Sequence, residues 1–231
     1  MAAAYSKIEL RLLDNYADDS VFIDAFCRGE DIHARTASEI FGVPLADVDR
    51  EMRRKAKAVN FGIIYGISEY GLGRDLGITR YEAKEYMEKY FHRYPSVERF
   101  QKEMVTQARR DGYITTLYGR RRYVPEINSR NFRQRTFAER TAMNTPLQGS
   151  AADIIKDVMV ALHQKLRNDG LQSRIILQVH DELILNCPKD ELDSVIPIVK
   201  QTMEHTKELK VPLTVDMKCG YNWYNMESIH L

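Results

Sequence analysis

The sequence is poor in cysteine and has no long apolar run, and each absence excludes a class of protein. Its three cysteines, Cys27, Cys187 and Cys219, lie far apart and form no CxxC pair. We therefore expect reduced thiols rather than a disulfide framework or a zinc site. No apolar run approaches the roughly 18 residues of a membrane-spanning helix, and the first residues lack the basic and apolar regions of a signal peptide. These features predict a cytoplasmic protein without a membrane partner.

The sequence does have the composition of a globular protein with a substantial core. Its 231 residues are 44% hydrophobic and 29% charged, enough for one large domain or two small ones. The net charge of +1 indicates no particular partner, but arginine is concentrated in one segment, where aromatic residues alternate with it. The residues are Tyr118, Arg120, Arg121, Arg122, Tyr123, Arg130, Phe132, Arg133, Arg135, Phe137 and Arg140. Such a segment suits binding to phosphates and bases, although most charge runs are ordinary solvated faces.

The first two thirds of the chain have the patterns of helices. Thr79 and Glu82 are spaced as a capping box, and Pro95 closes the helix that they begin. Further helices are expected from Ser96 to Asp111, before Gly112, and from near Ser150 to Asn168, before Gly170. Apolar residues recur at helical spacing in the first of these two and are assigned to the core: Val97, Phe100, Met104, Val105 and Ala108.

The last third has the pattern of an antiparallel sheet. Two short apolar runs, Arg174–Val179 and Glu182–Cys187, flank His180 and Asp181 and predict a hairpin with a polar tip. A helix from about 190 to 205 and a strand over 212–219 follow. Helices first and strands later predict the α+β class, with one mainly helical lobe.

The segment from Arg53 to Gly66 places cations and aromatic rings on one helix face. Arg53, Lys57, Phe61 and Tyr65 are each four residues apart, so their directions differ by only about 40° per step. Two cations followed by two rings suit a nucleoside triphosphate. An ordinary amphipathic helix explains the spacing equally well. Three glycines are expected to let the chain turn tightly after this helix: Gly66, Gly71 and Gly73.

Two adjacent carboxylates, Asp181 and Glu182, follow His180 at the expected hairpin tip. A turn can direct both side chains toward one cleft, and nucleotidyl transfer needs acidic ligands for two Mg²⁺ ions. One ion activates the primer 3′-hydroxyl and the other holds the triphosphate. Taken alone, however, this tripeptide more simply predicts a solvated acidic turn.

Four blocks in order give a more specific interpretation: Tyr5–Arg11, Arg53–Gly66, Thr145–Asp153 and Gln178–Glu182. Together they resemble the signature blocks of the family A DNA polymerases, the bacterial DNA polymerase I type, and the resemblance extends to about Tyr224. It implies template-directed transfer of dNTPs to a primer 3′-hydroxyl with two Mg²⁺ ions, and primer–template DNA and dNTPs as partners. It also implies a first palm motif over 1–12, a fingers subdomain over 13–140 and a C-terminal palm segment over 141–231.

The resemblance assigns a role to each matching residue. Residues expected at the dNTP are Arg53 and Lys57 on the triphosphate, His33 on the phosphates, Phe61 near the sugar, Tyr65 at the nascent pair and Glu9 beside the ribose 2′ position. Residues expected at the primer–template are Arg140, Asn144, Gln148 and His180. Metal binding is expected from Asp181, the adjacent Glu182 and the backbone carbonyl of Tyr5. Each of His33, Gln148 and Glu9 also has a simpler interpretation as a helix-end or surface residue.

The chain departs from the family pattern at its first block. The family has an aspartate directly before Tyr-Ser, where this sequence has Ala4. That aspartate bridges both metal ions in the family, so Asp181 would lack its main partner carboxylate. Lys7 stands where glutamine is common, which is a milder change.

The family's polymerase core is also about twice as long as this chain, and the thumb and remaining palm strands lie in the part before the first block. The sheet around Asp181 is therefore expected to have an exposed edge or apolar face. The N-terminal half of the polymerase is an expected further partner. The alternative hypothesis is a non-catalytic nucleotide or primer–template binding module, or an engineered fingers–palm fragment.

Overall fold

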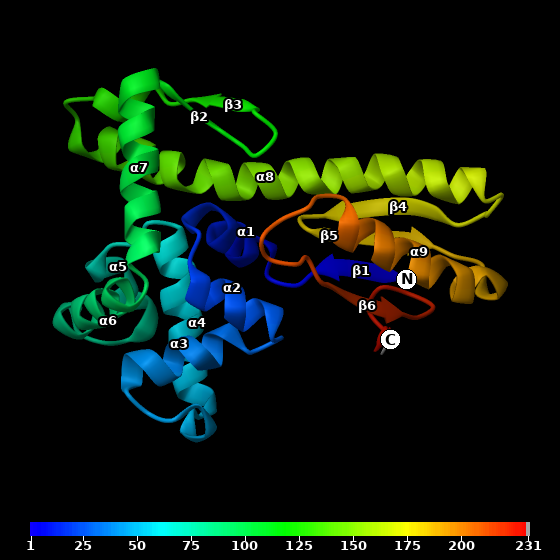
Figure 1. The fold of residues 1–231 in the computed structure, drawn as a ribbon, viewed down its shortest axis with the longest axis horizontal. Helices are drawn as coiled ribbons and strands as arrows, with labels where there is room; N and C mark the ends of the chain where they lie inside the picture. The colour runs from blue at the N-terminus through cyan, green and yellow to red at the C-terminus, as the bar shows by residue number, and fades with distance from the viewer. Residues whose placement is uncertain (230–231) are drawn as a thin grey trace. The chain divides into compact units, whose positions relative to one another are not determined.

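The computed structural model describes residues 1–229, and these form two compact units. One unit combines Met1–Arg11 with the segment from Ser150 onward, and the other comprises Leu12–Gly149 (Figure 1). Antiparallel strands occur together with many helices, which confirms the α+β class. Within residues 1–229, no helix is long and apolar enough to cross a membrane.

The unit of residues 12–149 is mainly helical. Its elements are the end of α1 (Ile8–Ala17), α2 (Ser20–Cys27), α3 (Ile32–Phe41), the 3-10 turn η1 (Leu45–Asp47), α4 (Arg50–Ile64), α5 (Glu69–Leu76), α6 (Arg80–Arg93), α7 (Pro95–Asp111), the hairpin of β2 (Tyr113–Thr115) and β3 (Arg121–Tyr123), the 3-10 turn η2 (Pro125–Asn128) and the first part of α8 (Phe132–Asn168). Thr79 and Glu82 form the expected capping box at the start of α6. Gly112 ends α7 in the left-handed conformation, as expected.

Aromatic side chains fill the core of this unit. Phe22 stacks on Tyr94, with ring centroids 3.9 Å apart, and Tyr90 packs 4.9 Å from Tyr94. All three are at most 1% exposed. The predicted core positions on α7 are confirmed for Val97, Phe100 and Ala108, which are buried; Met104 is partly buried against a neighbouring apolar cluster, and Val105 is also only partly buried.

Helix α8 begins much earlier than the sequence patterns predict, at Phe132 instead of near Ser150. Asn131 starts it, because its side chain accepts from the backbone N–H of Arg133 at 3.0 Å. The helix continues through Pro146, which removes a hydrogen bond and normally ends a helix. Tertiary packing outweighs that cost, because the apolar side chains along this segment are buried: Ala138, Ala142 and Leu147.

Only one of the three glycines expected to turn the chain after α4 does so. Gly66 has φ +65, which glycine adopts without steric cost. Gly71 and Gly73 lie inside α5, so their predicted role is wrong. There they allow close packing, since a Cβ on Gly71 would lie 2.9 Å from Ile67 Cγ1 and one on Gly73 would lie 3.0 Å from the Ile78 carbonyl oxygen.

The other unit contains a five-stranded antiparallel sheet in the order β4-β5-β1-β6-β7. The strands are β1 (Ala2–Tyr5), β4 (Arg174–Val179), β5 (Glu182–Asn186), β6 (Val215–Cys219) and β7 (Glu227–Ser228), accompanied by the 3-10 turn η3 (Lys189–Glu191) and α9 (Leu192–His205). The predicted hairpin is confirmed as β4 and β5. The final strand begins at Val215, later than the predicted start at residue 212. Residues 212–214 are bound by Arg11 instead, which donates to the Pro212 carbonyl and the Thr214 hydroxyl.

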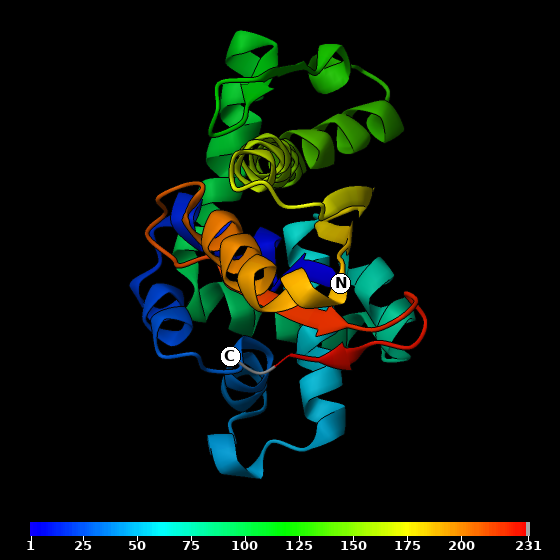
Figure 2. The ribbon, with the colours of Figure 1, turned by 90° about the vertical axis from the view of Figure 1, so that its right-hand side faces the viewer.

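Strand β1 occupies the centre of the sheet, and its short side chains let α9 pack closely. Ala3 pairs with Leu183 on one side and Met217 on the other, and all three are buried. Tyr5 lies on the same face by alternation, and its hydroxyl donates to the Met203 carbonyl on α9 at 2.6 Å. Figure 2 shows α9 alongside the sheet.

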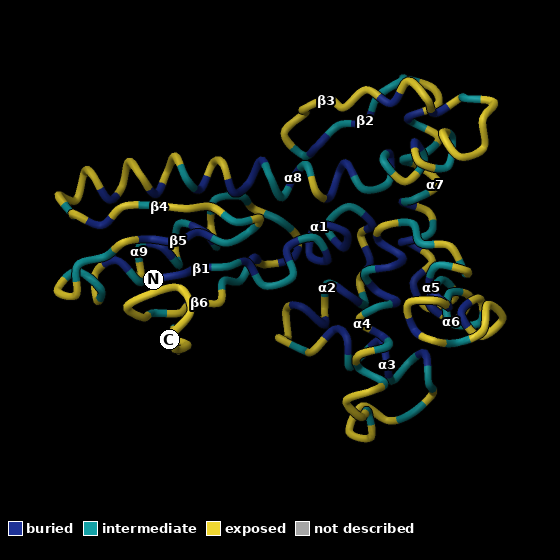
Figure 3. Tube along the Cα trace, turned by 180° about the vertical axis from the view of Figure 1, so that it is seen from behind, coloured by how far each residue is buried: buried dark blue, intermediate teal, exposed yellow. Residues whose placement is uncertain are grey.

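Strand β4 forms one edge of the sheet and is largely exposed (Figure 3). Ile176 is 62% exposed and Leu177 is 45% exposed. The pairing with β5 shifts register between Ile175 and Leu177, which is a β-bulge. An exposed edge with apolar side chains therefore lies directly before the His180–Asp181 turn.

Candidate functional site

Helix α4 displays the predicted row of cations and rings. Asp49 caps its start by accepting from the Met52 N–H at 2.7 Å. The side of the helix that carries Ala56, Val59 and Ile63 is buried, which leaves the residues spaced by four at least partly exposed: Arg53, Lys57, Phe61 and Tyr65. The rings of Phe61 and Tyr65 are nearly parallel, with centroids 6.3 Å apart. Tyr65 is the residue that ends the helix.

Arg53 is held by a carboxylate from the neighbouring helix. Its Nε donates to Asp31 Oδ2 at 2.7 Å, and Asp31 also caps α3 by accepting from the N–H groups of His33 and Ala34. Partial burial raises the pKa of Asp31, but the hydrogen bonds from Arg53 and from these two amides outweigh it and hold the pKa below its ordinary value. The cation is thereby fixed near the start of α4.

His33 lies beside the same helix and is only 2% exposed. Its Nδ1 is 3.0 Å from the Asn60 side-chain nitrogen on α4, and its ring centroid is 5.7 Å from that of Phe61. The fold therefore brings Arg53, Phe61 and His33 together from two helices. Asn60 was not predicted from the sequence. It could have been found in the sequence as a polar residue on the apolar side of an amphipathic helix, because buried polar side chains usually have a hydrogen-bond partner.

Three candidate DNA-binding residues lie on α8, each four residues apart: Arg140, Asn144 and Gln148. Arg140 is exposed and passes close to the end of α4, since a Cβ built on Gly66 would lie 3.0 Å from Arg140 Cγ. The side-chain oxygen of Asn144 is buried and has no hydrogen-bond partner within residues 1–229. A buried acceptor of this kind is costly unless something donates to it.

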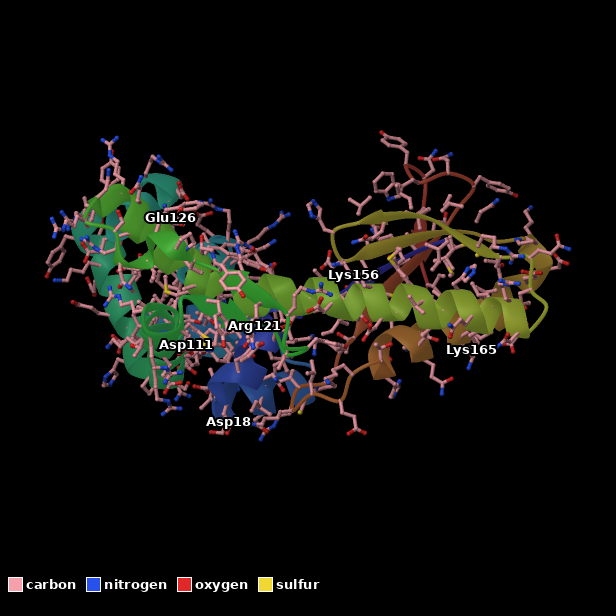
Figure 4. All side chains as sticks on the ribbon, turned by 90° about the horizontal axis from the view of Figure 1, so that it is seen from above. Asp18, Asp111, Arg121, Glu126, Lys156 and Lys165 are labelled. Carbon is pink, nitrogen blue, oxygen red and sulfur yellow. The ribbon has the colours of Figure 1, made fainter. Side chains whose placement is uncertain are left out.

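The arginine-rich segment forms a surface with exposed rings. Tyr123, Phe132 and Phe137 are between 62% and 70% exposed. The guanidinium of Arg121, labelled in Figure 4, lies 4.7 Å from the centre of the Tyr113 ring, and that of Arg135 lies 5.7 Å from the centre of the Phe132 ring. Stacked arginines keep their donors available at the ring edge, so this surface suits phosphates and bases.

Asp181 and Glu182 lie where β4 and β5 meet: His180 and Asp181 form the two-residue turn, and Glu182 begins β5. His180 has φ +54 there, a conformation that costs a non-glycine residue energy. Gln178 steadies the turn by donating to the His180 carbonyl at 2.8 Å. The Tyr5 N–H donates to the Asp181 carbonyl at 3.2 Å, so the turn is attached to the end of β1.

Ala4 lies between two carboxylate-bearing strands. It pairs with Glu182 on β5 and with Asp216 on β6, and directly paired residues point to the same face of a sheet. Asp216 was not predicted, because strand pairing brings it to Ala4 from far along the chain. Glu9 belongs to the same unit, in the first turn of α1.

The side chains near Ala4 can be compared with the ligands that a magnesium ion takes. Mg²⁺ has six oxygen ligands in octahedral geometry, of which one or two are usually protein carboxylates and the others waters and substrate phosphates. Among residues 1–229, no group of three or more histidine, cysteine, aspartate or glutamate side chains could hold a metal ion. The Ala4 methyl group occupies the position between Glu182 and Asp216, where an aspartate would stand beside two other carboxylates.

The sequence is similar to known DNA polymerases. A sequence profile described as "DNA polymerase family A" matches residues 1–225. The chain is similar to DNA polymerase I of Geobacillus stearothermophilus, with 55% identity over 97% of this chain and 26% of that protein. It is also similar to DNA polymerase I of Bacillus subtilis, with 51% identity and the same coverage of each chain. The chain therefore spans about a quarter of the length of these relatives.

A solved structure with a similar fold is the POL domain of Pol1 from M. smegmatis in complex with DNA primer-template and dNTP. Its TM-score is 0.90 at 46% identity, over 93% of this chain and 38% of that chain. Sequence profile, relatives and fold thus agree. The chain belongs to DNA polymerase family A.

Proposed function

We propose that this chain supplies the nucleotide-binding and part of the DNA-binding residues of a template-directed DNA polymerase, which transfers dNTPs to a primer 3′-hydroxyl. The single observation that carries the proposal is the partly exposed row of two cations and two rings on α4. In this proposal, residues 13–140 form the fingers subdomain of the polymerase. Residues 1–12 are the first palm motif, and residues 141–231 are the C-terminal palm segment.

In this proposal the α4 row grips the incoming nucleotide. Arg53 and Lys57 neutralise the triphosphate, and Asp31 keeps Arg53 in a fixed geometry through its 2.7 Å hydrogen bond. Phe61 packs on the sugar, and Tyr65 lies at the nascent pair. His33 binds a phosphate oxygen.

Other residues bind the primer–template and select the sugar. Along one face of α8, Arg140 and Gln148 are exposed. Between them, the buried side-chain oxygen of Asn144 has no hydrogen-bond partner within residues 1–229 and could accept one from DNA-bound water or a base. His180 lies beside the primer end. Glu9 crowds the ribose 2′ position, and a carboxylate there disfavours a 2′-hydroxyl by steric exclusion.

Two Mg²⁺ ions belong to the intact site, with Asp181, Glu182 and the Tyr5 carbonyl as ligands. Because Ala4 supplies no carboxylate beside Asp181, we expect nucleotidyl transfer to be impaired in this chain alone. The remaining palm and the thumb would come from the N-terminal half of the polymerase. The alternative proposal, a non-catalytic module that binds nucleotide or primer–template, rests on the same Ala4.

A pair of lysine variants tests nucleotide binding. Lys57→Ala removes one triphosphate cation from the α4 row and should weaken dATP binding by about tenfold, which is the size expected for one charge-assisted hydrogen bond. Lys55→Ala is the matched control, because Lys55 lies about 200° around the same helix. Isothermal titration with dATP measures both affinities. Equal affinities for the two variants would contradict the assignment of the α4 row.

A further inference from the structure

Asn60 links α3 to α4 through several side-chain hydrogen bonds. The residue is fully buried. Its side-chain nitrogen is 3.0 Å from His33 Nδ1 and 3.2 Å from the Thr36 hydroxyl oxygen, and that hydroxyl is 2.8 Å from the Ile32 carbonyl. The side-chain oxygen of Asn60 also lies 3.2 Å from the Thr36 hydroxyl.

The donors in this set can be assigned by counting protons. A hydroxyl has a single proton, and Thr36 directs it to the closer acceptor, the Ile32 carbonyl at 2.8 Å. The Thr36 oxygen then accepts from the Asn60 amide nitrogen. That nitrogen has two protons, and in the amide orientation of this structure the second is donated to His33 Nδ1, which is then the unprotonated nitrogen of the ring.

We propose that Asn60 is a positioning residue that fixes His33 as the neutral tautomer with its proton on Nε2. The bond made by one imidazole nitrogen determines which nitrogen carries the proton. A phosphate oxygen is an acceptor and needs an N–H donor, whereas the other neutral tautomer would present a lone pair at Nε2. This inference rests on the proposed triphosphate contact of His33.

The consequence is that α4 contributes to nucleotide binding with two faces. Its exposed face carries Arg53 and Lys57, while its buried face uses Asn60 to orient a histidine of α3. The Asp31 carboxylate, two residues before His33, fixes Arg53 by accepting from its Nε at 2.7 Å. Both ligands of the triphosphate would therefore be set before the nucleotide arrives.

The tautomer can be measured directly and without nucleotide. Long-range ¹H–¹⁵N correlation spectra of the ¹⁵N-labelled chain distinguish Nε2–H, Nδ1–H and doubly protonated rings. The signals of His33 are identified among those of the six histidines by their loss in His33→Gln. We expect the Nε2–H pattern for His33, and an Nδ1–H pattern would overturn the inference. No variant at Asn60 is needed for this result, and it is independent of the Lys57→Ala test of nucleotide binding.

Two substitutions at Asn60 separate positioning from packing. Asn60→Leu keeps the number and branching of the side-chain heavy atoms but removes the donor, so dATP should bind about tenfold more weakly. In Asn60→Asp, the carboxylate accepts a hydrogen bond from Nδ1–H and favours a doubly protonated ring that still has Nε2–H, so its dATP affinity should stay within about threefold of the unaltered chain. Its His33 spectrum should change to the doubly protonated pattern. Circular dichroism confirms that each variant is folded. Unweakened dATP binding by folded Asn60→Leu would overturn the positioning role.

Discussion

Restoring a carboxylate at position 4 should make the stability of the chain depend on magnesium. In Ala4→Asp, the new side chain would stand between Glu182 and Asp216 on the same face of the sheet. Directly paired side chains are about 5 Å apart. In the absence of a metal ion, the three carboxylates would repel one another.

The expected repulsion follows from that spacing. Two like charges about 5 Å apart repel by about 0.8 kcal/mol in water and about 3 kcal/mol at an effective dielectric constant of about 20. Asp216 is exposed and Glu182 is partly exposed, so the lower figure applies to each pair. We expect Ala4→Asp to lower the free energy of unfolding by about 1 to 2 kcal/mol in EDTA. Ala4→Asn, which has the same shape and no charge, is the control.

Magnesium should reverse this loss in the aspartate variant alone. At a free Mg²⁺ concentration about ten times the dissociation constant, binding to the folded state adds about 1.4 kcal/mol. Urea denaturation at several Mg²⁺ concentrations and constant ionic strength measures it. The reasoning fails if Ala4→Asn loses as much stability as Ala4→Asp, or if the unaltered chain gains as much from Mg²⁺.

Three further outcomes follow from particular contacts. Gly66→Ala should lower the free energy of unfolding by about 2 to 4 kcal/mol, because the added Cβ would lie 2.6 Å from Met143 Cε at φ +65. Gly29→Ala, with φ +69 and open space around it, should cost only about 1 kcal/mol, and equal losses would contradict the packing argument. Asp31→Asn keeps the helix cap but removes the charge paired with Arg53, so it should cost up to about 1 kcal/mol at pH 6. Because the folded pKa of Asp31 is lowered, its stabilisation is complete above the ordinary pKa of 3.8 and is lost as the pH falls through the folded pKa. The stability difference between the unaltered chain and Asp31→Asn should therefore shrink below pH 4, and a constant difference would count against the ion pair. Thr79→Ala removes the capping box of α6 and should cost about 1 kcal/mol, measured by thermal unfolding against Thr106→Ala on an exposed helix surface as control.

The elements that the sequence predicted well are those defined by local signals. The capping box at Thr79, the helix that carries Arg53 and Lys57, and the β4–β5 hairpin each follow from side-chain periodicity or caps within about 15 residues. Local signals failed where distant packing overrides them. The predicted start of α8, near Ser150, is too late, because Pro146 normally ends a helix. The segment before Pro146 is nevertheless helical, since it is buried against residues far away in the sequence.

The candidate site shows the same division. Spacing alone located the row on α4, and the family resemblance supplied roles for residues such as Asp181. Neither indicated that Asn60 bonds to His33 from another helix, or that Asp216 faces Ala4 from another strand. Both depend on tertiary pairing, which a pattern within one segment does not contain.

Primer extension is the most direct test of the central claim, that this chain retains a nucleotide-binding face and lacks a complete metal site. The assay uses a labelled primer annealed to a template, four dNTPs and Mg²⁺, with an intact DNA polymerase I as the positive control. We predict no extension above background by the chain alone, and extension by Ala4→Asp when the N-terminal half of the polymerase is supplied with it. Extension by the unaltered chain at a rate comparable to the intact enzyme would contradict the account.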